Sequence, residues 1–119
     1  MLSAAEAASS KTDDPIVVLD VGELLGITDH FVITSGSNVR QVRTIAEEVE
    51  MRVKALGAGS PRYVEGLADA NWVLLDYGDF VVHVFLDEAR RFYNLERLWS
   101  DAPRVEHPWA EGERVGVEL

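Results

Sequence analysis

The sequence predicts a single α+β domain of about five short strands packed with helices. The chain has 119 residues, which is enough for one hydrophobic core and too few for two. Its hydrophobic content of 47% and charged content of 27% are typical of a folded globular protein. One long amphipathic helical pattern stands among several short apolar runs, which have the length of strands.

The N-terminal part predicts a short lead-in segment and two strands. Residues 1–14 are small and polar, and they predict either a flexible arm or a short helix that ends before Pro15. Residues 16–19 and 31–34 are short apolar runs, interpreted as buried strands joined by an irregular connection. Residues 35–38 then supply a turn and a candidate N-cap for a helix.

Residues 39–56 form the predicted long helix. Apolar side chains recur there at steps of three and four, which places them on one helical face. They are Val39, Val42, Ile45, Ala46, Val49, Val53 and Leu56. Gly57 and Gly59 follow, and glycine is common just past the last turn of a helix.

A β-hairpin is predicted from residues 72–77 and 80–86, after a short strand at 62–65. The Gly78-Asp79 dipeptide suits a two-residue turn, and such a turn sets the register of the two strands. The expected pairs are Trp72 with Phe85, Leu74 with His83 and Asp76 with Val81. The opposite face is uniformly apolar and should pack on the long helix. It consists of Val73, Leu75, Tyr77, Phe80, Val82, Val84 and Leu86.

The face that carries Trp72 and Leu74 also carries Asp76 and His83, and such mixed composition is typical of interface cores. Aromatic and arginine residues, which are enriched at binding hot spots, follow it in the chain. These are Arg90, Arg91 and Tyr93. Phe85 and Trp99 are interpreted as core. Residues 95–99 should form about one helical turn with Leu95, Leu98 and Trp99 on a common side.

Charge and composition exclude several classes of function. The net charge of −10 disfavours broad contact with nucleic acid and favours a basic partner. The alternative is that this charge only keeps the protein soluble. Without cysteine there is no disulfide or thiolate chemistry. No apolar run approaches the roughly 20 residues of a membrane span, and the N-terminus does not resemble a secretory signal. A cytoplasmic protein is therefore expected. No metal site is predicted, because three histidines lack ligand spacing. They are His30, His83 and His107.

No complete catalytic site is predicted, and no cofactor. Ser35 and Ser37 flank Gly36 but lack the nucleophile-elbow pattern, so helix capping explains them better. A Gly-Ser turn before a helix can hold phosphate, as in nucleotidyl-transfer enzymes. Those enzymes also need an Asp-x-Asp pair for metal ions, and none follows here. A minimal nucleotidyltransferase that uses Gly36-Ser37 remains the alternative from the enzyme class.

Several strings of the sequence are specific enough to carry a family resemblance. They are IVVLDV at 16–21, TDHFVITSGS at 28–37, WVLLDYGD at 72–79, VHVF at 82–85 and FYNLERLW at 92–99. Over residues 14–105 the chain resembles the ribosomal silencing factor family, RsfS, also called Iojap or YbeB. The departures lie at the ends, where a shorter segment replaces the family's N-terminal helix.

The resemblance implies a mixed sheet related to the nucleotidyltransferase fold, without enzymatic activity. It further implies binding to the large ribosomal subunit through ribosomal protein L-fourteen, with little direct RNA contact. Such binding would block joining of the small subunit, repress translation in starvation and assist large-subunit assembly. Family members often form homodimers in isolation. The domain is expected at residues 15–105, with a mobile acidic tail at 106–119.

Combining the mixed hairpin face with the resemblance predicts a partner-binding site. Its residues are Trp72, Leu74, Asp76, Tyr77, His83, Arg91 and Tyr93. Trp72 and Leu74 are expected to anchor the contact, and the others to add polar complementarity or to lie at its border. A generic homodimerisation module with no ribosome contact at this face is a further alternative.

Overall fold

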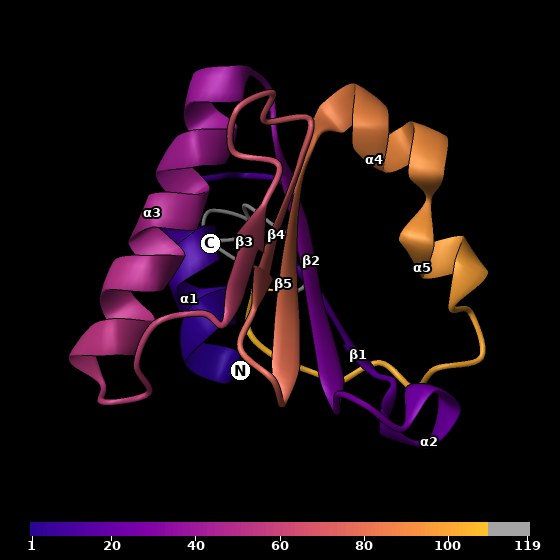
Figure 1. Ribbon diagram of the computed structural model, residues 1–119. Coiled ribbons are helices and arrows are strands. Elements are labelled where there is room, and N and C mark those ends of the chain that lie inside the picture. Colours follow the sequence, from indigo (N-terminus) through magenta and orange to yellow (C-terminus); the bar gives the residue numbers. More distant parts are fainter. Residues whose placement is uncertain (110–119) are drawn as a thin grey trace, which may run out of the picture.

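The computed structural model describes residues 1–109, which form one five-stranded sheet with helices on both faces (Figure 1). The helices are α1 (Leu2–Ser9), α2 (Gly22–Leu25), α3 (Val39–Ala55), α4 (Asp87–Tyr93) and α5 (Leu95–Leu98). The strands are β1 (Val17–Asp20), β2 (His30–Gly36), β3 (Tyr63–Glu65), β4 (Trp72–Asp76) and β5 (Phe80–Leu86). No helix in this part of the chain is long and apolar enough to cross a membrane.

The strands follow the order β1-β2-β5-β4-β3 across the sheet. Only β2 and β5 run parallel, and the three other neighbouring pairs are antiparallel. The predicted α+β domain with a mixed sheet is therefore confirmed. The parallel pair is possible because α3, β3 and β4 lie between β2 and β5 in the sequence, which gives the chain room to cross over.

Helix α3 covers one face of the sheet together with α1 (Figure 1). It starts at Asn38, whose side chain accepts a hydrogen bond from the Gln41 amide at 2.8 Å. The predicted apolar stripe is confirmed, since its central members are fully buried against the sheet. These are Val42, Ile45, Ala46, Val49 and Val53. Leu56 lies beyond the last helical residue and is exposed.

The β4–β5 hairpin has the register that the turn predicts. Trp72 pairs with Phe85, Leu74 with His83 and Asp76 with Val81. The Tyr77 amide donates to the Phe80 carbonyl at 2.9 Å across the turn. Gly78 has a φ of 94°, which explains the glycine at this position. The division into two faces is also confirmed, because Val73, Leu75, Val82 and Val84 are buried under α1 and α3.

The N-terminal segment contributes to the core. Of the two expectations for residues 1–14, the structure has the helix, α1. Ala4, Ala5, Ala7 and Ala8 are fully buried, and their small side chains let α1 lie close against α3. The short helix expected for this segment is therefore part of the core of the domain.

At the other end, residues 103–109 return to the sheet. The Val105 amide donates to the Val18 carbonyl at 2.8 Å, and the Ile16 amide donates to the Trp109 carbonyl at 3.4 Å. Trp109 also packs on the core beneath α1 and α3. A mobile tail was expected at residues 106–119, but its first residues, 106–109, contact the domain. Residues 110–119 lie outside the described residues, so the expectation is not tested there.

Helices α4 and α5 lie over the other face of the sheet and near one end of it (Figure 1). Asn94 separates them in a left-handed conformation with a φ of 49°. This bend turns Leu98 outward, where it is 70% exposed, while Leu95 is buried and Trp99 is half-buried. The expected common apolar side of residues 95–99 is therefore wrong for Leu98.

Candidate functional site

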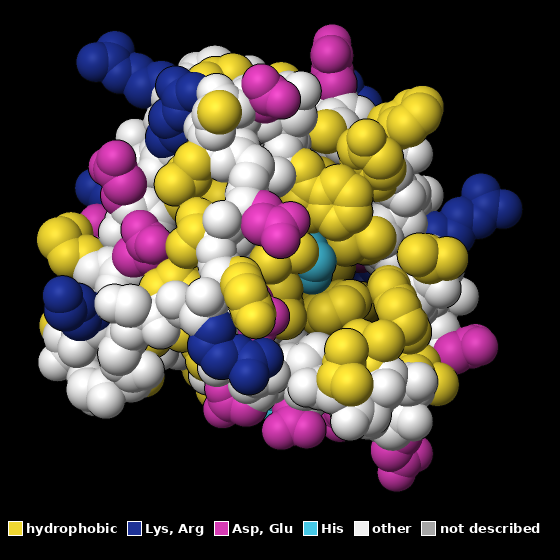
Figure 2. Space-filling model, viewed as in Figure 1, with side chains coloured by type: hydrophobic (Ala, Val, Ile, Leu, Met, Phe, Trp, Pro, Cys, Tyr) yellow, Lys and Arg dark blue, Asp and Glu magenta, His cyan; other side chains and the backbone are white. Residues whose placement is uncertain are grey.

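The candidate site is a cluster of mostly aromatic side chains, some buried and some exposed, on the side of the sheet opposite α1 and α3, here called the aromatic face. Its members come from β2, β4, β5 and α4: Phe31, Trp72, Leu74, His83, Phe85 and Tyr93. The Trp72 ring lies 4.8 Å from the rings of both Phe85 and Tyr93. Figure 2 shows hydrophobic side chains gathered around a histidine on this side of the molecule.

His83 is the buried polar residue of the aromatic face, with 4% of its surface exposed. Its Nδ1 accepts a hydrogen bond from the Trp72 indole Nε1–H at 3.1 Å. The Phe31 ring stands edge-on to the imidazole, with 4.6 Å between the ring centroids. Burial lowers the pKa of His83 to about 4, so the ring is neutral at neutral pH. Because Nδ1 is the acceptor, the proton lies on Nε2.

The two expected anchors remain partly accessible. Trp72 and Leu74 are half-buried, and both pack against the apolar cluster on this side of the sheet. Asp76 lies on the same strand face, where its Oδ1 accepts from the Gly78 amide at 2.8 Å and lies 3.7 Å from Arg62 Nη2. Asp76 thus shapes the hairpin turn at the margin of the aromatic face.

Tyr77 lies away from the other residues of the predicted site. Its ring stacks on Phe80 at 4.8 Å and packs against the core beneath α1 and α3. Burial, and then the charge of Glu50, raise the pKa of the Tyr77 phenol to about 12. Strand alternation explains this position, since Tyr77 follows Asp76 and therefore points to the opposite face.

Helix α4 forms the border of the aromatic face and carries its most exposed aromatics. Tyr93 is 50% exposed and Phe92 is 80% exposed, and their rings meet at 5.0 Å. Arg91 is exposed on the same helix. Sequence reasoning did not select Phe92. No local pattern distinguishes Phe92 from a core residue, because its exposure of 80% depends on how α4 packs against the sheet.

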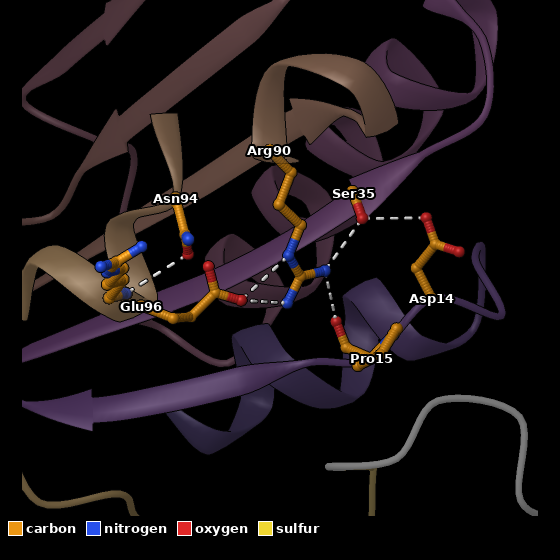
Figure 3. Close-up of polar contacts among 7 residues, drawn as sticks. Asp14, Pro15, Ser35, Arg90, Asn94 and Glu96 are labelled. Carbon is orange, nitrogen blue, oxygen red and sulfur yellow. Dashed lines mark hydrogen bonds and ion pairs between the residues drawn. The ribbon is translucent and has the colours of Figure 1, made fainter. Parts of the chain in front are cut away.

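A polar cluster holds α4 and α5 against the sheet (Figure 3). Arg90 donates to Glu96 Oε2 from Nε at 3.1 Å and from Nη2 at 2.7 Å. Its Nη1 donates to the Pro15 carbonyl and to Ser35 Oγ, both at 2.9 Å. The Ser35 hydroxyl in turn donates to Asp14 Oδ2 at 2.9 Å. Sequence reasoning assigned Ser35 to helix capping, but Ser35 is a buried strand residue within this cluster.

The same cluster borders a cavity of about 440 Å³ at the carboxyl ends of the parallel strands β2 and β5. Asp87 lines this cavity, and burial followed by the neighbouring Asp14 raise the pKa of its carboxyl to about 6. Among residues 1–109, no group of three or more histidine and carboxylate side chains could hold a metal ion.

The Gln41 side chain occupies the space beside the Gly36-Ser37 turn. Gln41 Oε1 accepts hydrogen bonds from the Ser37 amide at 2.6 Å and from the Ser37 hydroxyl at 3.0 Å. The Gln41 side chain also lies directly over Gly36. The amide and hydroxyl of Ser37 and the amide of Gln41 are thus already hydrogen-bonded within the molecule.

Comparison with known proteins assigns the chain to a family. The family model described as "Ribosomal silencing factor during starvation" matches residues 1–116. The ribosomal silencing factor RsfS of Halalkalibacterium halodurans is 42% identical over 103 residues, which are 87% of either chain. The mouse protein named "Mitochondrial assembly of ribosomal large subunit protein 1" is 36% identical over 87 residues, or 71% of this chain and 38% of the mouse chain.

A solved structure agrees with these sequence matches. The crystal structure of a Chromobacterium violaceum protein superimposes with a TM-score of 0.79 at 32% identity, over 93% of this chain and 89% of the other. The two proteins therefore share one fold, and their sequence identity indicates common descent. The chain belongs to the ribosomal silencing factor family, RsfS.

Proposed function

We propose that this protein binds the large ribosomal subunit through ribosomal protein L-fourteen and sterically blocks joining of the small subunit. It would thereby repress translation in starvation, and it would assist assembly of the large subunit. Family membership supports this role, as does the mouse relative, whose name refers to large-subunit assembly. Steric blocking needs only a folded body held on the joining surface, and no catalytic chemistry.

The observation that carries the proposal is the exposed aromatic rim beside a half-buried tryptophan. Phe92 and Tyr93 leave large aromatic surfaces open next to Trp72, which is the arrangement expected of an interface hot spot. Trp72 and Leu74 are proposed as anchors, with Arg91 and Tyr93 at the border. Tyr77 would support the contact only indirectly, through the hairpin turn.

Charge complementarity favours a basic protein as the partner. The chain carries a net charge of −10, which would attract a basic ribosomal protein and repel the phosphates of ribosomal RNA. Association should therefore slow as ionic strength rises, because salt screens this attraction. We also propose a cytoplasmic location and a homodimer in the free state.

Co-sedimentation with purified large subunits tests the proposal. Trp72→Ala and Phe92→Ala should each weaken binding, by about thirtyfold if the residue is a hot spot worth about 2 kcal/mol. Phe92 is highly exposed, so its truncation should leave the fold intact. Met51→Ala is the matched control, because Met51 is an exposed apolar residue of α3 on the other side of the sheet.

Two outcomes would contradict the proposal. The first is the absence of binding by the wild-type protein. The second is full binding by folded Trp72→Ala and Phe92→Ala proteins, which would place the contact elsewhere and favour a homodimerisation role for the aromatic face.

A further inference from the structure

His83 has one ring nitrogen that is hydrogen-bonded and one that is buried without a partner among residues 1–109. Its Nδ1 is occupied by the Trp72 indole, so its Nε2 carries the proton and is a donor. No acceptor for this Nε2–H is present in residues 1–109, although the atom is buried. The ring is enclosed by Phe31, Trp72 and Phe85, none of which offers an oxygen to it.

A buried donor without an acceptor needs an explanation. Nearly all buried polar groups in folded proteins are hydrogen-bonded, because an unmade hydrogen bond carries the full desolvation cost of the group. An apolar side chain would fill the same space in the free protein without this cost. The donor lies on the aromatic face, the surface that the proposed function assigns to a partner.

We propose that His83 Nε2–H donates a hydrogen bond to a neutral oxygen acceptor of the docked partner, a backbone or side-chain carbonyl next to the apolar group that contacts Trp72 and Leu74. This inference rests on the proposed function and adds to it the polar chemistry of the contact. The histidine thus acts as a specificity determinant, because a partner that places an oxygen opposite Nε2 binds more tightly than one that does not.

The acceptor is assigned as neutral for two electrostatic reasons. The chain is strongly acidic, and Asp76 lies on the same strand face two residues from Leu74, so a partner carboxylate or an RNA phosphate would be repelled. Burying an anion against the surrounding aromatic rings would also carry a large desolvation cost. A carbonyl oxygen avoids both penalties.

Because Nε2 is buried, a neighbouring side chain must move before a partner can reach it. Leu74 is the cross-strand neighbour of His83 and is half-buried, so a rotamer change at Leu74 is the simplest way to uncover the imidazole. Rotamer changes of this kind are common when interfaces form. The Trp72 indole meanwhile holds the ring in a fixed orientation through its hydrogen bond to Nδ1.

Two substitutions separate the proposed donor from the rest of the side chain. In His83→Asn, the amide reaches the position of Nδ1 but leaves nothing at Nε2. In His83→Gln, the longer side chain places its amide N–H near the Nε2 position. The affinity of each purified variant for purified large subunits is measured by co-sedimentation at fixed ionic strength, with thermal unfolding as the check on folding.

We expect His83→Asn to bind about tenfold or more weakly than wild type, because the partner's acceptor is then buried unpaired. His83→Gln should retain most of the affinity. If His83→Asn fails to fold, His83→Met replaces it, since methionine fills apolar space flexibly and has no donor. Equal binding by wild type and the donor-lacking variant would overturn this inference alone. An absence of binding by wild type would overturn the proposed function and this inference with it.

Discussion

Replacing Arg90 by alanine should weaken the attachment of α4 and α5 to the sheet and lower the free energy of unfolding. The Arg90 side chain is only 12% exposed, and its four hydrogen bonds reach Glu96, Pro15 and Ser35. One guanidinium therefore connects α4 to α5, to β2 and to the segment that precedes β1. Truncation would leave the Glu96 carboxylate and the Ser35 hydroxyl without this partner.

The expected loss can be estimated from these contacts. Removing one partner of a buried ion pair destabilises a protein by about 3–5 kcal/mol, mostly because the other charge is left uncompensated. Glu96 retains 18% exposure, so water can reach it, and we expect the lower figure of about 2–4 kcal/mol. This is a large share of the roughly 5–15 kcal/mol that stabilises a domain of this kind.

Urea unfolding followed by tryptophan fluorescence measures this change in the free energy of unfolding. Arg97→Ala is the matched control, because Arg97 is an exposed arginine on the neighbouring helix α5 and its loss should cost less than about 0.5 kcal/mol. A double-mutant cycle with Glu96→Gln should give a clear coupling energy between the two residues. A loss below about 1 kcal/mol for Arg90→Ala, or no coupling to Glu96, would refute this reasoning.

Three further predictions concern stability. The pKa of buried His83 is lowered to about 4, so the unfolded chain binds the proton more tightly and stability should fall by about 3 kcal/mol as pH drops from 6.5 to 4. Urea titrations should show this loss reduced in His83→Gln, and an unchanged loss would contradict it. The pKa of Asp87 is raised to about 6 by burial and by Asp14, so Asp87→Asn should stabilise the protein at pH 7.5 and not at pH 4.5. A Cβ at Gly66, where φ is 88°, would overlap the Trp72 carbonyl. Gly66→Ala should therefore lower the free energy of unfolding by more than about 2 kcal/mol. An unchanged midpoint of thermal unfolding would refute the clash.

The hairpin and the long helix show how far sequence patterns reach. A two-residue turn and strict alternation predicted the pairing of Trp72 with Phe85 and the division into two faces, because both depend on neighbouring residues in one strand pair. The spacing of apolar residues predicted the buried stripe of α3, because helical periodicity is also a local property of the sequence. The family resemblance added the mixed sheet, which no local pattern specifies.

The candidate site was only partly predictable. Trp72, Leu74 and His83 share a face because of strand alternation, and the structure brings them together with Tyr93 of α4. The exposure of Phe92 depends on the direction in which α4 leaves β5, which the sequence does not specify. The same holds for Leu98, which the bend at Asn94 turns away from the core.

The sequence by itself determined the local elements, the two faces of the hairpin and, through its motifs, the family. The tertiary structure alone decided which groups far apart in the chain meet. Arg90 contacts Pro15 and Ser35, which lie 75 and 55 residues earlier, and Asp14 lies beside Asp87. It also showed that the donor on His83 is buried without an acceptor in the described chain. The physical reason is that burial and hydrogen-bond partners depend on every element packed around a side chain, whereas periodicity reports only the element in which it lies.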